Sequence, residues 1–224
     1  MLEISKRWKK TYPGSTIGLL VLRGINNRQR PSYFLEAKHE LETRLRARYA
    51  GYDREKLKTD PVFSVYGDYY ANFRKTYHLL LQLETVAFEE KPISGPSPLV
   101  EAMFMAELDN KLLTAGHDLQ YVQGELQADL ANNREDYTGL GDRQRSTKPE
   151  DMLIRDEEGI LSSVIYGPDH RTRIREDTTD AVFTVYCPAG IPDDYLREHL
   201  RDIERYVSLL AGDLRRDHLQ VYPG

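Results

Sequence analysis

The spacing of apolar residues changes near Gly116, and this change constrains the fold more than any other feature of the 224-residue chain. Before Gly116, apolar residues recur every three or four positions, a spacing typical of amphipathic helices. After it, short runs rich in β-branched and aromatic residues alternate with turn residues, as strands do. A helical pattern returns only near the C-terminus. This order predicts an α+β fold rather than a regular series of alternating strands and helices.

One strand is expected ahead of the helices. Residues 16–22 (TIGLLVL) form a continuous apolar run, which is typical of a buried strand. Helices are then predicted from Pro31, from Asp60 and Pro61, over residues 76–88, and from Ser97 and Pro98 to about Ala115, where Gly116 would end the last of them. The prolines within residues 91–98 predict a loop before that helix.

The second half is predicted to supply most of the strands. The candidates are residues 124–130, 152–155, 160–166 and 181–186, with a turn at residues 156–159. Pro192 then opens a helix whose apolar face comprises Leu196, Leu200, Ile203, Val207 and Leu210, and residues 219–222 are the last candidate strand.

Charge is unevenly distributed along the chain. Residues 1–58 carry a net charge of +8 and residues 59–224 a net charge of −13, within a total of −5. We therefore distinguish a basic N-terminal strand and helix region, residues 1–58, packed on a main body, residues 59–224. Such asymmetry is typical of a face that binds a polyanion, and equally of the solvated faces of amphipathic helices.

Several chemistries are excluded by the sequence. Neither glycine-rich phosphate-binding motif occurs, and the motifs of zinc proteases and serine hydrolases are missing too. The six dispersed histidines and the single Cys187 provide no metal-ligand spacing, and Cys187 is expected to be a buried thiol. No apolar run has the length of a membrane span and the N-terminus lacks a secretory signal, so we expect no membrane partner. With a single cysteine the cytoplasm is the expected compartment, and the missing motifs lead us to expect no cofactor.

Two stretches carry motifs in a fixed order. The first contains LVE at residues 99–101, AGHDL at 115–119 and NREDYTGL at 133–140. The second contains MLIRD at 152–156, ILSSVIY at 160–166 and GPD at 167–169. Taken together over residues 60–190, these motifs resemble the B3/B4 tRNA-binding domain family, as in the B3/B4 editing domain of the phenylalanyl-tRNA synthetase β subunit.

The resemblance implies a three-layer fold with a β-sandwich-like core flanked by helices, and hydrolysis of the ester that joins a wrong amino acid to tRNA. His117 falls at the family's histidine segment and Asp169 at its acidic residue, so both are candidate catalytic residues; a helix cap is the alternative for His117. Met103 and Phe104 replace a polar Thr-Asn pair. With Gly167 they are expected to line the pocket, whose selectivity would differ from that for tyrosine.

Basic residues predict where RNA would bind. The candidates are Lys6, Arg7, Lys9, Lys10, Arg28, Arg30, Arg171 and Arg173. Trp8, Tyr12 and Tyr33 lie among the early ones and would either stack on unpaired bases or belong to the core. The spacing of Arg171, Arg173 and Arg175 predicts one face of a strand, which would guide a phosphate or protect a sheet edge.

The sequence thus favours a tRNA-binding protein, and the family resemblance implies an aminoacyl-tRNA hydrolase that acts in trans, with an aminoacyl group as its second ligand. Two alternatives remain open. One is a small-molecule or amino-acid-binding protein with the same pocket and no tRNA role, and the other is a non-catalytic interaction module. The sequence predicts no oligomeric state.

Overall fold

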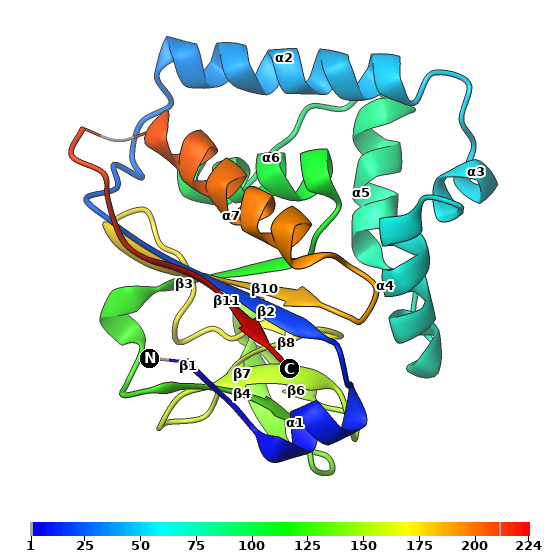
Figure 1. Cartoon of the computed structure of the whole chain (residues 1–224). Coiled ribbons are helices and arrows are strands. Elements are labelled where there is room, and N and C mark those ends of the chain that lie inside the picture. The colour runs from blue at the N-terminus through cyan, green and yellow to red at the C-terminus, as the bar shows by residue number, and fades with distance from the viewer. Residues whose placement is uncertain (1, 211) are drawn as a thin grey trace.

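Two β-sheets form successive layers, and helices cover the outer face of one of them (Figure 1). The computed structural model describes residues 2–210 and 212–224. One sheet has the order β11 (Arg215–Pro223), β2 (Thr16–Arg23), β10 (Asp180–Cys187), β3 (Thr114–Asp118). The other has the order β1 (Leu2–Ile4), β4 (Leu126–Leu130), β7 (Met152–Arg155), β8 (Ile160–Ser163), β9 (Gly167–Pro168), and β5 (Asp136–Gly139) and β6 (Arg143–Ser146) form a separate hairpin.

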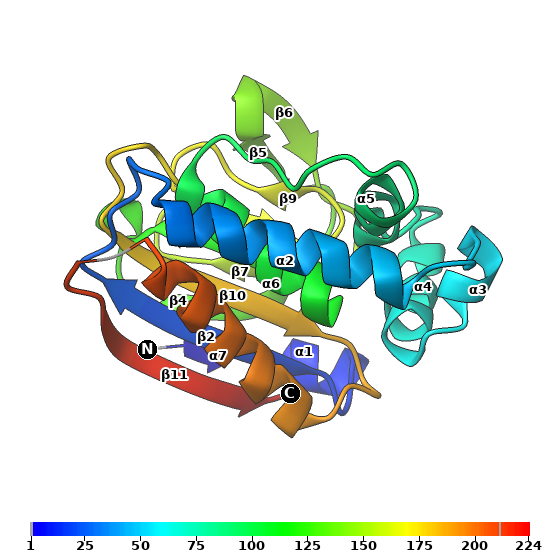
Figure 2. The ribbon, with the colours of Figure 1, turned by 90° about the horizontal axis from the view of Figure 1, so that it is seen from above.

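The helices, α1 (Lys6–Thr11) apart, lie beyond the four-stranded sheet. They are α2 (Ser32–Arg48), α3 (Arg54–Lys58), α4 (Pro61–Asn72), α5 (His78–Ala87), α6 (Pro98–Asn110) and α7 (Asp193–Ser208). Helices α6 and α7 pack on that sheet and α2 crosses above them, whereas α1 packs on β4 of the other sheet (Figures 1 and 2). The predicted α+β class and its layered arrangement of helices and sheets are confirmed.

Strand β2 lies inside the four-stranded sheet, as its continuous apolar run predicts. It pairs with β10 on one side and β11 on the other, both antiparallel. Helix α7 approaches β2 closely at Gly18, where a Cβ atom would lie 2.9 Å from Leu196 Cδ1. Glycine therefore allows the helix layer to close on the sheet. With β1 in the other sheet, the first 58 residues supply one strand to each layer.

The helix starts follow their predicted caps. The Asp60 carboxylate accepts a hydrogen bond from the Val62 amide at 3.0 Å, and Ser97 Oγ accepts one from the Val100 amide at 3.4 Å. The end predicted for the second of these helices is wrong. Helix α6 stops at Asn110, because Lys111 takes a left-handed conformation at φ 63°. The strand β3 then begins at Thr114, where a helix was expected.

The alternating arginines at positions 171, 173 and 175 do not share a strand face, so that prediction is wrong. The Asp169 carboxylate accepts hydrogen bonds from the amides of Arg171 and Thr172, which folds the segment into a turn. Arg173 alone makes a strand-like bridge, opposite His117.

The opposite charges of residues 1–58 and residues 59–224 meet as ion pairs within the molecule. Glu101 of α6 binds both Arg30 and Lys38, at 2.8 and 2.9 Å. Further pairs join Arg44 and Arg48 to Asp109 and Arg54 to Glu84. Much of the basic surplus is thus matched by acidic side chains of the body. Over residues 2–210 and 212–224, no helix combines the length and apolarity that crossing a membrane requires.

Candidate functional site

A cavity of about 490 Å³ opens between α5, α6, the edge strand β3 and the β8–β9 turn. We call it the main cavity. Its wall is mostly apolar and includes Met103 and Phe104 of α6, Ile174, and Gly167 of β9. All three residues expected to line a pocket, Met103, Phe104 and Gly167, are therefore on this wall. The volume lies in the range of small-molecule sites, ~300–1,000 Å³.

Two glycines shape the wall. A Cβ atom on Gly116 would lie 2.8 Å from Ile174 Cδ1 and 3.1 Å from Met103 Sδ, so a larger residue would push these side chains into the open space. Gly167 has φ +80°, a conformation that favours glycine and turns the chain sharply between β8 and β9. The cavity exists because β3 is an edge strand, which leaves room beside it for α6 and the β8–β9 turn.

Glu107 brings a carboxyl group to this apolar wall. The residue is only 2% exposed, and its Oε1 accepts a hydrogen bond from the Thr114 amide at 2.7 Å. Burial raises the pKa of the Glu107 carboxyl to about 8. Glu107 is not among the residues predicted from the sequence, although it occupies a position in the apolar stripe that runs through Val100, Met103 and Phe104.

Arg173 brings a positive charge to another part of the same wall. Its Nη1 donates to the carbonyl of His170 at 2.7 Å, and within the described residues it forms no ion pair with a carboxylate. Glu107 lies beside Thr114 and Arg173 beside His117, three residues further along β3. At roughly 3.4 Å per residue, Glu107 and Arg173 therefore lie beside positions of β3 that are about 10 Å apart.

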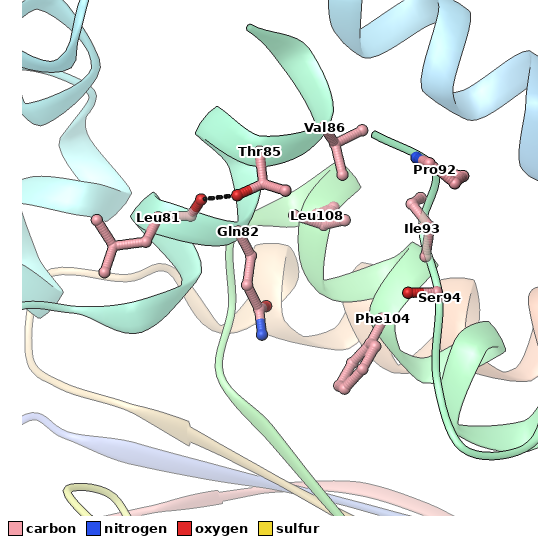
Figure 3. Close-up of a pocket in the computed structure, with 9 residues that line it drawn as sticks. All are labelled: Leu81, Gln82, Thr85, Val86, Pro92, Ile93, Ser94, Phe104 and Leu108. Atoms are coloured by element: carbon pink, nitrogen blue, oxygen red, sulfur yellow. Dashed lines mark hydrogen bonds between the residues drawn. The ribbon is translucent and has the colours of Figure 1, made fainter. Parts of the chain in front are cut away.

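A second, smaller hollow of about 240 Å³ adjoins the main cavity (Figure 3). This outer hollow is lined by α5, by the loop at Pro92 and Ile93, and by Phe104. Gln82 and Phe104 belong to the linings of both spaces. Figure 3 shows these two side chains extending from their helices toward the same open space. The half-buried Phe104 ring thus stands at the boundary between the two spaces.

His117 and Asp169 lie together, next to lining residues of the main cavity but not in its lining. His117 Nδ1 is 3.9 Å from Asp169 Oδ1, and the Thr172 hydroxyl lies between them. That hydroxyl donates to Asp169 and accepts from His117 Nδ1 at 2.8 Å. We call these three residues the polar triad. His117 and Asp169 do not belong to the cavity lining of the described residues.

Burial governs the ionisation of the polar triad. It lowers the pKa of the fully buried His117 to about 3 and raises that of Asp169. The Thr172 hydroxyl donates its proton to Asp169, so it can only accept from His117 Nδ1. The neutral imidazole therefore carries its single N–H proton on Nδ1, and Nε2 is unprotonated. His117 Nε2 has no hydrogen-bond partner among the described residues. His117 is a strand residue of β3, and the helix-cap alternative does not apply.

The cations predicted to bind RNA differ in their partners and exposure. Arg30 and Arg171 form ion pairs with Glu101 and Asp156, at 2.8 and 2.9 Å. Arg7 donates to the carbonyl of Ala131 at 2.9 Å. Lys6, Lys9 and Lys10 are exposed on α1, which packs on β4. Arg28 is exposed and, with Arg30, lines a small pocket that shares Pro96 with the main cavity.

The aromatic residues among these cations differ in environment. Trp8 is fully buried, and its indole donates to Ser15 Oγ at 2.7 Å. Tyr12 donates its hydroxyl to the carbonyl of Glu150, and Tyr33 is half exposed. Trp8 therefore belongs to the core. Cys187 is fully buried, as expected, and burial raises its thiol pKa. No cluster of three or more metal-ligating side chains occurs in the part of the chain that the structure describes.

Comparisons with known proteins agree on one relationship. The profile of the B3/4 domain family matches residues 86–203, more than half of the chain. The phenylalanine–tRNA ligase β subunit of Mycoplasma genitalium is 32% identical over 111 residues, which is 46% of this chain and 14% of that protein. The crystal structure of an N-terminal fragment of the phenylalanyl-tRNA synthetase β subunit from Pyrococcus horikoshii shares the fold, with a TM-score of 0.50 and 12% identity, over 100% of this chain and 54% of the fragment.

Proposed function

This chain belongs to the B3/4 domain family, and from that premise we propose that it binds the aminoacylated end of a tRNA and hydrolyses the aminoacyl ester. The observation that carries the proposal is the main cavity. It lies between α6, β3 and the β8–β9 turn, all within the segment that matches the family. Its apolar wall suits an amino-acid side chain, and its polar groups suit the charged parts of an aminoacyl nucleotide.

Ester hydrolysis makes three demands on such a site. Water must attack the carbonyl carbon, the bond to the ribose oxygen must break, and donors must stabilise the oxyanion that forms. In the proposal the amino-acid side chain lies against Met103 and Ile174. Arg173 faces the ester or the adjoining phosphate, since its guanidinium is the positive charge on the wall that lacks a carboxylate partner in the described chain.

We assign a positioning role to His117 and Asp169. Through Thr172 they connect β3 to the turn that carries Arg173 and Ile174. Loss of either side chain would leave buried polar groups unpaired and would loosen that turn. In this proposal neither residue touches the substrate.

RNA contact is assigned to cations that remain free to meet phosphates. Arg28 and Arg173 lie at or beside the main cavity and suit the single-stranded end of tRNA, while Lys6, Lys9 and Lys10 suit a more distant part of the same molecule. The half-buried ring of Phe104 offers a stacking surface to a base that leaves the cavity.

A filter-binding titration against bulk tRNA at rising salt tests the RNA part. We expect binding at low salt that weakens as salt rises, because phosphate contacts release counterions. The variant Arg28→Ala is expected to weaken binding, whereas Arg30→Ala is a control whose cation is already paired with Glu101. Undetectable binding at low salt would contradict the proposal.

A deacylation assay with a panel of mischarged tRNAs tests catalysis. Arg173→Ala is expected to lower kcat/KM by at least ~10-fold, the order expected for removing one transition-state donor. Hydrolysis of every substrate at the spontaneous rate would remove the catalytic part and leave tRNA binding to be judged by the titration.

A second function is favoured by the ion pairs that match much of the basic surplus within the molecule. In that case the main cavity binds a free amino acid or a related small molecule, with no tRNA role. Thermal stabilisation by free amino acids, together with no tRNA binding, would favour this function over the first.

A further inference from the structure

Glu107 is the one carboxylate among the described residues that line the main cavity. Its backbone lies in the last turn of α6, which fixes the side chain against the start of β3. Oε1 is held by the Thr114 amide, and this is the single side-chain hydrogen bond that the described structure gives to the carboxyl group. The other oxygen is thereby available to the cavity.

The surroundings of this carboxyl are apolar or neutral. The titratable and charged groups around it are Tyr70 of α4, Tyr77 just before α5, His78 of α5, His199 of α7, Tyr186 of β10 and Lys111. The Lys111 ammonium is paired with Asp60 at 2.6 Å, and the His199 imidazole, bonded to Thr114 Oγ1, has its pKa lowered to about 3 by burial. Nothing described in the protein supplies Glu107 with a positive partner.

We propose that Glu107 binds the amino group of the ligand in the main cavity and selects for ligands that carry one. The inference rests on the proposed function, because it identifies the amino group as that of the aminoacyl moiety. A ligand ammonium would supply the positive charge that Glu107 lacks among the described residues and would donate a hydrogen bond to its free carboxylate oxygen. With Arg173 about 10 Å away along β3, the wall offers opposite charges to the opposite ends of an aminoacyl nucleotide.

The binding step has a defined proton balance. With a pKa of about 8, Glu107 is mostly a neutral acid at pH 6.5. An α-ammonium group at that pH arrives with its proton. To form the ion pair, the carboxyl group loses its proton to solvent and the ligand keeps its own, so about one proton is released for each ligand bound.

The experiment measures the number of protons released on ligand binding. Titration calorimetry is run at pH 6.5 in buffers of different ionisation enthalpy with a stable amide analogue, phenylalanyl-3′-amino-3′-deoxyadenosine, and with its des-amino counterpart. Phenylalaninamide and phenethylamine serve as probes without the nucleoside. The variants are Glu107→Gln, which keeps an acceptor for the Thr114 amide, and Glu101→Gln as a matched control on the same helix, because Glu101 faces Arg30 and Lys38.

We expect the amine ligand to release about one proton on binding to the wild type and to Glu101→Gln. With Glu107→Gln we expect no proton release and affinity lower by at least ~10-fold, the order measured for a lost charged hydrogen bond. The des-amino analogue should bind the wild type and Glu107→Gln equally and release no proton.

Failure of the role of Glu107 and failure of the proposed function give different results. Equal binding of the amine and des-amino analogues without proton release would overturn the role of Glu107 and leave the proposed function standing. Binding of phenylalaninamide with proton release, but no binding of the adenosine analogue, would support Glu107 and count against a tRNA substrate. If no amine binds, both proposals fall. Thermal melting of each variant establishes that a loss of binding is not a loss of fold.

Discussion

Strand β3 connects two buried polar centres that contrast in how they meet the rest of the molecule. Beside Thr114, the carboxyl of Glu107 has one hydrogen bond and faces the main cavity. At His117, further along the strand, the members of the buried polar triad bond to one another, and Asp169 borders a separate open pocket rather than the main cavity. In both centres burial shifts pKa values, that of Glu107 upward and that of His117 downward.

The contrast teaches that a shifted pKa does not by itself identify a ligand site. In the polar triad, the hydrogen-bonding capacity of Asp169 is taken up by Thr172 and Arg171. Glu107 keeps an oxygen for a ligand, and an apolar space lies in front of it. Facing the apolar main cavity, rather than burial or a free hydrogen-bonding atom, is what separates Glu107 from His117, whose Nε2 also has no partner among the described residues.

The largest effect is expected from breaking the polar triad. His117→Ala should lower the free energy of unfolding by about 3 kcal/mol, because it leaves a cavity and unpaired groups around a fully buried side chain. Asp169→Ala should act similarly, since it frees the amides of Arg171 and Thr172. Urea denaturation measures both. A variant with full stability and no hydrolysis would contradict the positioning role and restore His117 as a catalytic residue.

The pH dependence of stability should single out Glu107. Its pKa is raised in the folded protein, so its contribution to stability is full below the unfolded pKa and is lost as pH rises toward about 8. The variant Glu107→Gln should therefore gain stability relative to the wild type between about pH 5 and 8, by at most about 1.4 kcal/mol per pH unit.

Denaturation at several pH values measures this difference. Asp151, whose pKa burial raises to about 7, and the neutral buried His199 contribute equally to both proteins and cancel. A constant difference across the pH range would show that Glu107 ionises normally.

A smaller effect should come from narrowing the main cavity. In Gly116→Ala, the new methyl group meets the flexible ends of Ile174 and Met103, which should shift into the open space at a cost of about 1 kcal/mol. Binding of bulky aminoacyl analogues should weaken more than binding of small ones, as calorimetry would measure. Gly67→Ala, where the added atom meets nothing within 4 Å, is the matched control. Equal losses for all analogues would place the ligand elsewhere.

The smallest effect should be on salt dependence. Arg173→Ala should reduce the slope of the logarithm of tRNA affinity against the logarithm of salt by about 0.7, the value for one phosphate contact in a single strand. Arg171→Ala is expected to leave the slope unchanged, because Arg171 is paired with Asp156. Filter binding over a range of salt concentrations measures both slopes.

Local signals predicted much of the fold, and long-range pairing explains the rest. Asp60 and Ser97 marked two helix starts, and the apolar run of β2 marked a buried strand. Strand β3, with the sequence TAGHD, has no strand pattern of its own and is extended because it pairs with β10. The ion pairs of the basic region also depend on tertiary contacts that composition does not contain.

The candidate site was predicted in part for the same reason. Met103, Phe104 and Gly167 could be expected on one wall, because the family resemblance orders their segments. The resemblance also brought His117 and Asp169 together, and the structure places them 3.9 Å apart. That neither residue lines the main cavity could not be predicted, because it depends on where α6 ends and on the register of β3. Glu107 was visible as a charge within an apolar helix stripe and was overlooked.

The most direct measurement is a crystal structure of the protein with phenylalanyl-3′-amino-3′-deoxyadenosine. The aminoacyl group is expected in the main cavity, with its nitrogen within hydrogen-bonding distance of Glu107 and its nucleoside toward Arg173 and Phe104. A ligand bound against the polar triad, or on a surface away from the main cavity, would contradict the assignment of Glu107 as the binding group and of the polar triad as structural.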